Sequence, residues 1–478
     1  MHDNIVIDPV TRIEGHAKIT LRLDEAGAVD DARFHVTEFR GFEEFCRGRP
    51  VFEMPSITAR TCGICPVSHL LASAKAGDAI LAVSIPPAAM AQRRLANLGQ
   101  VIQSHSLSFF HLSAPDLLLG MDGDPTQRNV FGLMAAAPDV ARRGIRLRKF
   151  GQEVIAAVTG RRIHGPWIVP GGVRNPLSAE AREAIGALVP EARRAAADTV
   201  TEFTELLDQF GPEVEAFGTF DSLFLGHCGP DGSWEHYGGG LRAVDAAGTV
   251  VVDGLDPARY RDVIGEWGNA DSYLKSPYWK PLVNGDDPMP GIYRVGPLAR
   301  LNVCDRFGAP LADEALTEFR ERAGGVARSS FFYHYARLIE VLGCVELIGA
   351  LLDDPVLFDT HVRARAGINA THAVGASEAP RGTLFHEYTV DDDGLITSVN
   401  MVIATGQNNL AMNRTVTQIA RTFINGADVT EGALNRVEAG IRAFDPCLSC
   451  STHALGQMPM LVEITDHRGQ VIAIARRD

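Results

Sequence analysis

The sequence predicts an α+β fold in which helices predominate, with β-strands at the N-terminus and a β-hairpin tail at the C-terminus. Three observations support this prediction. Apolar residues alternate with polar ones near residue 20, they recur at helical spacing over several long stretches, and two alternating segments flank a turn near the end. No Pro/Ser/Gly linker divides the 478 residues, so one continuous body is expected.

The first half of the chain changes from strand to helix after residue 62. Alternation predicts strands around 5–7, 19–23 and 32–36, with a turn at 25–27. Helical spacing then predicts helices over 68–83, 88–112 and 178–210. Ser68 is a suitable N-cap for the first of these helices, and Pro190 should kink or split the last.

The second half begins with a stretch over 218–310 that is rich in Gly, Pro, Asp and aromatic residues, where we expect short strands and long loops. Helical spacing returns over 312–372 and 408–443. The segments 460–465 and 470–475 alternate on either side of a turn and predict the hairpin.

Charge and composition exclude some classes of protein. The 45 Lys and Arg residues against 59 Asp and Glu give a net charge of −14, which argues against nucleic acid as the main partner. The N-terminus has no secretory signal, and no apolar run reaches the roughly 18 residues expected of a membrane span. We therefore expect a cytoplasmic protein with reduced thiols.

Two C-x-x-C pairs, Cys62/Cys65 and Cys447/Cys450, suggest metal binding or redox chemistry in a reducing compartment. Their four thiolates would select zinc, copper(I), an iron–sulfur cluster or nickel. A structural zinc site is one reading, although zinc pairs usually lie much closer in sequence. A thioredoxin-like redox site is another, but it needs a βαβ context that is absent here.

The residues beside the cysteines go beyond what a structural zinc site needs. Arg60 and His69 flank the first pair, and Asp445 and His453 flank the second. Acidic and cationic side chains also occur in the segments Glu14-Gly15-His16 and Ala379-Pro380-Arg381-Gly382. These neighbours favour a reactive metal centre.

Five segments in chain order resemble the signature blocks of the nickel–iron hydrogenase large subunit: DPVTRIEGH, RTCGICPVSH, IHGPWIVPGG, EAPRGTLFH and DPCLSCSTHA. They extend from residue 8 to residue 454, and VIATGQNN and THALGQMP are most similar to the bidirectional, NAD-linked cytoplasmic group. The resemblance implies the catalytic subunit of an oxidoreductase that splits H2 reversibly and heterolytically into a proton and a hydride.

The resemblance also implies a set of metal ligands. Nickel would be held by Cys62, Cys65, Cys447 and Cys450, with Cys65 and Cys450 bridging to an iron that carries carbon monoxide and cyanide. A structural magnesium ion would be bound by Glu43 and His453. Carboxylate oxygen suits magnesium, whereas histidine is an unusual ligand for it.

Catalytic roles follow from the same resemblance. Cys450 is a candidate proton acceptor, Glu14 is the expected first proton relay, and Arg381 is the guanidine above the open metal position. Arg381 either polarises H2 or acts as a base. Pro380 and His69 are expected to line the cofactor.

Three further residues are expected near these groups. Asp445 should orient the site or pair with Arg381, and His105, like His69, is a candidate hydrogen-bond donor to cysteine or cyanide. Ser104 stands where membrane-bound relatives often carry Asp, so less charge is expected over the metals.

Partner subunits are expected because this chain lacks further cluster-binding cysteine spacings and a G-x-G-x-x-G dinucleotide motif. NAD-binding diaphorase subunits and an iron–sulfur small subunit would supply these functions. The resemblance also implies nickel and iron insertion proteins and an endopeptidase. That endopeptidase would cut between His453 and Ala454, leaving residues 1–453 as the catalytic body and removing 454–478.

Two other classes of protein stay open. A structural relative in a quinone-reducing respiratory complex would share the fold but would have lost the cysteines, and all four are present here. A zinc-stapled scaffold would bind zinc alone, so metal analysis separates it from a hydrogenase.

Overall fold

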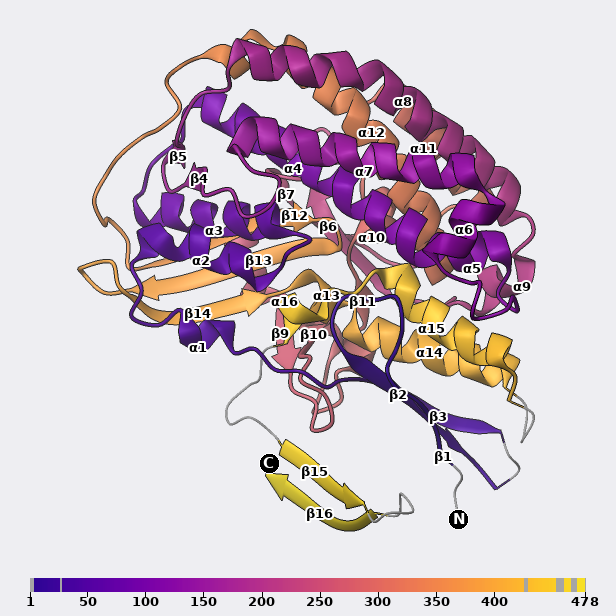
Figure 1. The fold of residues 1–478 in the computed structure, drawn as a ribbon. Helices are drawn as coiled ribbons and strands as arrows, with labels where there is room; N and C mark the ends of the chain where they lie inside the picture. Colours follow the sequence, from indigo (N-terminus) through magenta and orange to yellow (C-terminus); the bar gives the residue numbers. More distant parts are fainter. Residues whose placement is uncertain (1–3, 26–27, 425–428, 453–459, 466–470, 478) are drawn as a thin grey trace.

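Long helices packed against one another form one side of the molecule in the computed structural model, which describes residues 4–25, 28–424, 429–452, 460–465 and 471–477 (Figure 1). Helix α7 (Pro138–Thr159) packs on α4 (Pro87–Leu107) and on α8 (Ala179–Leu207), and α12 (Tyr333–Asp353) packs on α4 and α8. Their shared apolar faces form the main hydrophobic core.

Shorter helices surround this group. They are α1 Phe42–Phe45, α2 Met54–Thr58, α3 Pro66–Ile80, α5 Ala114–Leu119, α6 Val130–Ala136, α9 Gly211–Ala216, α10 Pro297–Val303, α11 Pro310–Ala323, α13 Ala404–Gln407, α14 Asn409–Phe423, α15 Glu431–Phe444 and α16 Leu448–Ser451.

The strands form several small sheets rather than one large one. The N-terminal sheet has the order β1–β2–β3 (Asn4–Ile7, Ala17–Leu23, Val29–Val36), and a second three-stranded sheet has the order β12–β13–β14 (His372–Ala379, Gly382–Val390, Ile396–Val402). A four-stranded sheet has the order β11–β6–β7–β8 (Tyr293–Arg294, Leu223–Cys228, Gly240–Val244, Val250–Leu255). The remaining pairs are β4–β5 (Ile168–Val169, Gly172–Val173), β9–β10 (Ile264–Trp267, Ser276–Trp279) and β15–β16 (Met460–Thr465, Val471–Arg477).

The predicted fold class is confirmed, with N-terminal strands, a helical majority and a C-terminal hairpin. Ser68 is not an N-cap, because α3 begins at Pro66 and buries Ser68 inside the helix. Helix α8 is not split at Pro190 but continues through it. The helical stretch predicted over 312–372 ends at Asp353, and the strands β12–β14 were not predicted.

Helix α3 packs against β12 and β13 (Figure 1), and its N-cap residue Cys65 lies in one buried cluster with Ala379, the last residue of β12. Helix α16, near the end of the chain, packs against α13 at the same place. Among the described residues, no helix combines the length and the apolar character needed to cross a bilayer.

Candidate metal centre

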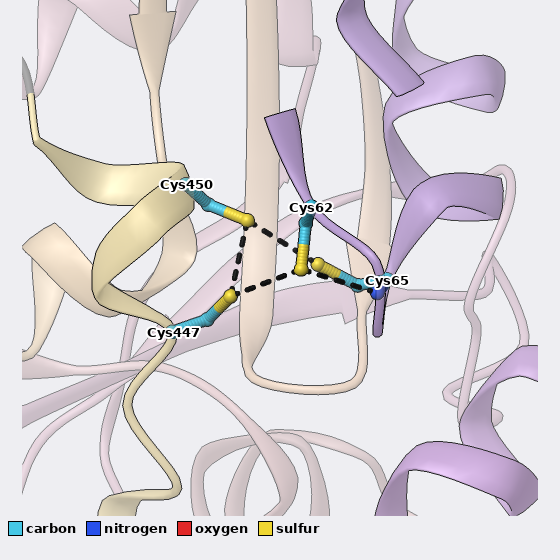
Figure 2. Close-up of side chains that lie close together, drawn as sticks. All are labelled: Cys62, Cys65, Cys447 and Cys450. Carbon is cyan, nitrogen blue, oxygen red and sulfur yellow. Dashed lines mark hydrogen bonds between the residues drawn. The ribbon is translucent and has the colours of Figure 1, made fainter. Parts of the chain in front are cut away.

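Four cysteine sulfurs from the two ends of the chain meet in the interior (Figure 2). The Sγ of Cys62 lies 3.2 Å from that of Cys447, and the Sγ of Cys65 lies 3.5 Å from that of Cys450. All four Sγ atoms lie within 4.8 Å of one another, and all four residues are buried. The predicted convergence of the two pairs is therefore confirmed as geometry. In the described ranges this is the one His/Cys/Asp/Glu group arranged to hold a metal ion.

Local backbone structure presents each pair. Cys62 follows a short 3-10 turn, and its Sγ accepts a hydrogen bond from the backbone N–H of Ile64 at 3.2 Å. Cys65 is the N-cap of α3, where the helix dipole favours a negative charge. On the other side, the backbone N–H of Cys447 donates to Oγ1 of Thr405 at 3.0 Å.

Four buried thiols at this spacing cannot all ionise without a cation. Hydrogen bonds from Cys447 and Cys450 lower the pKa of Cys65 well below its usual value, whereas burial raises the pKa of Cys450 well above it. A bound metal cation would displace the shared protons and stabilise all four thiolates. Four soft donors around one point fit nickel, and paired sulfurs can bridge to a second metal.

Arg381 points a cationic group toward these sulfurs. It lies in the two-residue Pro380-Arg381 turn between β12 and β13, where Ala379 pairs with Gly382. Its guanidinium contacts the carboxylate of Asp445 at 3.1 Å and donates to Oγ of Ser104 at 3.3 Å. The predicted pairing of Arg381 with Asp445 is confirmed. Burial alone would lower the pKa of Arg381, but Asp445 and the cysteine sulfurs outweigh it and raise the pKa well above the usual value.

Gly382 lets this turn approach the neighbouring chain closely. Its φ of +138° is unusual for a residue with a side chain, and a Cβ there would lie 2.4 Å from Val295. The turn therefore requires glycine directly after Arg381.

Arg300, a residue that the sequence did not suggest, holds the turn in place. Its guanidinium donates to the carbonyl oxygens of Ala379 (2.9 Å) and Pro380 (3.0 Å) and pairs with Glu340 at 2.6 Å and with Glu378 at 2.7 Å. Burial alone would raise the pKa of Glu340, but Arg300 outweighs it and holds the pKa at about 2. The turn is thus fixed by a buried arginine that two carboxylates hold in place.

Replacing Arg300 with methionine should destabilise the fold by about 3–5 kcal/mol, because two buried carboxylates would lose their shared cation. The measurement is the shift in the urea unfolding midpoint of the purified protein. The control is Arg322→Met, which removes an exposed arginine that pairs with Asp208 and Glu318 and should cost no more than about 1 kcal/mol. Equal shifts in the two variants would contradict the role given to Arg300.

Glu14 lies against the second cysteine loop. Its carboxylate accepts a hydrogen bond from the backbone N–H of Ser449 at 3.0 Å, and its carbonyl accepts from Leu448 at 3.1 Å. Glu14 also forms a parallel β-bridge with Cys447. The next residue, Gly15, has a φ of +89°, and a Cβ there would lie 2.6 Å from Leu448. The half-buried carboxylate of Glu14 therefore contacts the backbone of Ser449, the residue directly before Cys450.

The other predicted residues have different surroundings. His69 contributes a side-chain hydrogen bond to Cys65, as expected, whereas His105 lies 2.8 Å from Glu340 and not on a cysteine. Glu43 accepts from the backbone N–H of Met401 at 2.8 Å and lies 3.4 Å from Lys275. His453 lies outside the described residues, so its predicted pairing with Glu43 stays a prediction.

Sequence reasoning missed His164 and His386, although both lie inside the quoted signature segments. The Nε2 of His164 lies 2.9 Å from the carbonyl oxygen of Cys62. The Nε2 of His386 lies 3.1 Å from Nδ1 of His69. Their presence in IHGPWIVPGG and EAPRGTLFH was the signal that could have identified them.

Comparison with known proteins assigns these features to a family. A model described as nickel-dependent hydrogenase matches residues 40–122 and 237–453, and a HoxL-like model matches residues 4–39. The beta subunit of the NAD-reducing hydrogenase HoxS from Cupriavidus necator is 43% identical, covering 99% of each chain. One subunit of the vhu F420-non-reducing hydrogenase from Methanococcus voltae is 42% identical, covering 88% of this chain and 98% of the relative.

Solved structures agree with these matches. A crystal structure of an NAD+-reducing [NiFe]-hydrogenase in the H2-reduced state superposes with a TM-score of 0.91 at 47% identity, covering 94% of this chain and 99% of that one. The Ni-Fe-Se hydrogenase from D. vulgaris Hildenborough superposes with a TM-score of 0.78 at 25% identity, covering 95% of this chain and 100% of that one.

Proposed function

The chain belongs to the nickel-dependent hydrogenase family, and we propose that it is the catalytic large subunit of an NAD-linked nickel–iron hydrogenase. In this role it splits H2 reversibly into protons and electrons. The observation that carries the proposal is the meeting of Cys62, Cys65, Cys447 and Cys450 in one buried cluster. The cluster argues against a structural relative in a respiratory complex, because such relatives lack these four cysteines.

The four sulfurs are the proposed ligands of nickel, and Cys65 and Cys450 would also hold an iron that carries carbon monoxide and cyanide. Such a centre, when bound, supplies the Lewis acid at which H2 is polarised and split. The pair Cys65/Cys450 suits the shared role because their Sγ atoms lie 3.5 Å apart, one from each loop. Pro380 and His69 flank this centre from the β12–β13 turn and from α3.

Arg381 is proposed to act as a fixed cation and not as a base. A guanidinium resists deprotonation, and the carboxylate of Asp445, 3.1 Å away, anchors its charge. A guanidinium held in a dry site stabilises negative charge that develops in front of it without reorganising. The Oγ of Ser104 accepts a hydrogen bond from the guanidinium, so the group that contacts it on this side is a neutral hydroxyl.

Replacing Arg381 with lysine should lower H2 oxidation by about 10²–10³-fold while nickel content stays unchanged, because the ammonium keeps the charge but loses the planar donor geometry. Dye-linked H2 oxidation and metal analysis of the same sample check this. A matched control is Arg60→Lys. Arg60 lies two residues before Cys62, but its guanidinium donates hydrogen bonds to the carbonyl oxygen and the Oγ of Ser56. An equal loss in the control would argue against a specific role for Arg381.

Glu14 and Cys450 are proposed to carry the proton away from the centre. The thiolate of Cys450 accepts it, and the carboxylate of Glu14, hydrogen-bonded to the adjacent residue Ser449, takes it on. Glu14 is half-buried, which gives the proton an exit toward the surface.

Partner subunits complete the reaction. The similar proteins are named as subunits of an NAD-reducing hydrogenase and of F420-non-reducing hydrogenases. We propose that electrons pass first to an iron–sulfur small subunit, then through diaphorase subunits to NAD, in the cytoplasm. Nickel and iron insertion proteins would load the centre.

Magnesium binding and tail removal are proposed from the family resemblance. Glu43 and His453 are the proposed magnesium ligands, with residues 1–453 as the mature body. An endopeptidase would remove residues 454–478 after the metals are inserted. Intact-mass measurement of the purified enzyme, before and after metal loading, tests this processing.

Metal analysis combined with infrared spectroscopy tests the proposed function. We expect nickel and iron in a ratio near one to one, with bands of metal-bound carbon monoxide and cyanide. Zinc alone, without these bands, would overturn the proposal in favour of a structural scaffold.

A further inference from the structure

A chain of buried side chains leads away from Cys65. His69, on α3, contributes a hydrogen bond to Cys65, and its Nδ1 lies 3.1 Å from Nε2 of His386 on β13. The other nitrogen of His386, Nδ1, lies 2.6 Å from the hydroxyl of Tyr388, two residues further along the strand. His386 and Tyr388 have no exposed surface, and His69 is 1% exposed.

The order of the donors along this chain is fixed by its two ends. A metal-bound thiolate at Cys65 can only accept a hydrogen bond, so His69 must donate to it. The hydrogen of His69 then lies on Nε2, and its Nδ1 must accept from Nε2–H of His386. His386 consequently accepts at Nδ1 from the hydroxyl of Tyr388.

The surroundings of Tyr388 support this order. Burial raises the pKa of Tyr388 well above its usual value, so the hydroxyl keeps its proton. Each imidazole therefore has a defined partner on both nitrogens.

We propose that Tyr388 and His386 are positioning residues that place the proton of His69 on Nε2, so that His69 donates an N–H hydrogen bond to Cys65. This inference rests on the proposed function, because only a metal-bound thiolate at Cys65 makes the direction of these hydrogen bonds matter for the reaction. A donated hydrogen bond withdraws electron density from the sulfur and so from the metals it binds. Tyr388 and His386 thus adjust the electron density at the metals, although neither residue contacts a metal or the substrate.

The first test is Tyr388→Phe, which removes one hydroxyl and keeps the ring. The carbon monoxide and cyanide bands of the loaded enzyme should shift, nickel content should stay unchanged, and H2 oxidation should fall by about tenfold. The matched control is Tyr335→Phe, which removes another buried hydroxyl on α12, where the ring packs against Phe203 and Phe319. Unshifted bands in Tyr388→Phe, or equal shifts in both variants, would overturn the proposal.

The second test does not depend on nickel, iron or activity. In protein labelled with ¹⁵N-histidine and loaded with zinc, which holds Cys65 as a thiolate without catalysing the reaction, both His69 and His386 should carry their hydrogen on Nε2, and the spectrum of His386 should change in Tyr388→Phe. A hydrogen on Nδ1 of His69 would overturn the proposal. If the wild-type enzyme lacks the carbon monoxide and cyanide bands, the proposed function fails instead, whatever the histidine spectra show.

A double variant measures the coupling. Glutamine at position 386 offers an amide N–H to His69 that does not depend on Tyr388. Adding Tyr388→Phe to His386→Gln should therefore produce no further band shift. A further shift as large as that in the single variant would show that Tyr388 acts by another route.

Discussion

Replacing Cys450 with serine should abolish both nickel binding and H2 oxidation. The alcohol of serine is a hard, weakly acidic ligand, and it cannot replace a thiolate that must bind a soft metal and bridge to a second one. The side chain of Cys450 also lies 3.1 Å from the Sγ of Cys447, so its loss leaves an incomplete ligand set. Nickel and iron content of the purified variant, measured beside its activity, checks this expectation.

The control for this prediction is Cys344→Ser. Cys344 is also fully buried, but it lies on α12 in the helical core. The control should lose some stability through the buried hydroxyl while keeping its nickel. Full nickel occupancy in Cys450→Ser, or equal metal loss in both variants, would contradict the proposed ligand set.

Replacing Glu14 with glutamine should lower H2 oxidation by about 10²–10⁴-fold without loss of nickel. The amide oxygen can still accept the hydrogen bond from Ser449, so the loop keeps its shape. The amide cannot take up and release a proton at ordinary pH, so the route out of the site is interrupted. Activity, metal content and the infrared bands should be measured on one preparation, with only the activity expected to change.

Glu438→Gln provides the comparison for Glu14. Glu438 is a carboxylate on α15 that accepts hydrogen bonds from Thr11, in the same N-terminal loop, and pairs with Arg442. Its amide variant should keep nearly all of the activity. Unchanged turnover in Glu14→Gln would show that protons leave by a different path.

The candidate site was predictable from the sequence to the extent that its chemistry is local. Two C-x-x-C pairs identify the ligand loops, and the Pro380-Arg381 turn and Glu14 are recognisable from the segments around them. Arg300 was not predictable, because an isolated arginine on a helix gives no sign that it will be buried against a turn 80 residues away. Its importance comes from tertiary packing alone.

The fold shows the same division. The N-terminal strands were predicted because one face is buried and the other exposed, which leaves an alternating pattern. Strand β13 was missed because every residue from Gly382 to Val390 is buried or half-buried, so no exposed position marks an alternation. The N-terminus of α3 was placed two residues late, because Pro66 at the first helical position was overlooked as a start signal.

The meeting of Cys62 with Cys447 has a consequence for how the enzyme denatures. These two residues are 385 positions apart, so a metal that holds both would tie almost the whole chain into a ring. Such a tie removes conformational entropy from the unfolded chain worth roughly 6 kcal/mol. Heat inactivation should then be governed by escape of the ion, since the polypeptide can explore its disordered states fully only once that ring has opened.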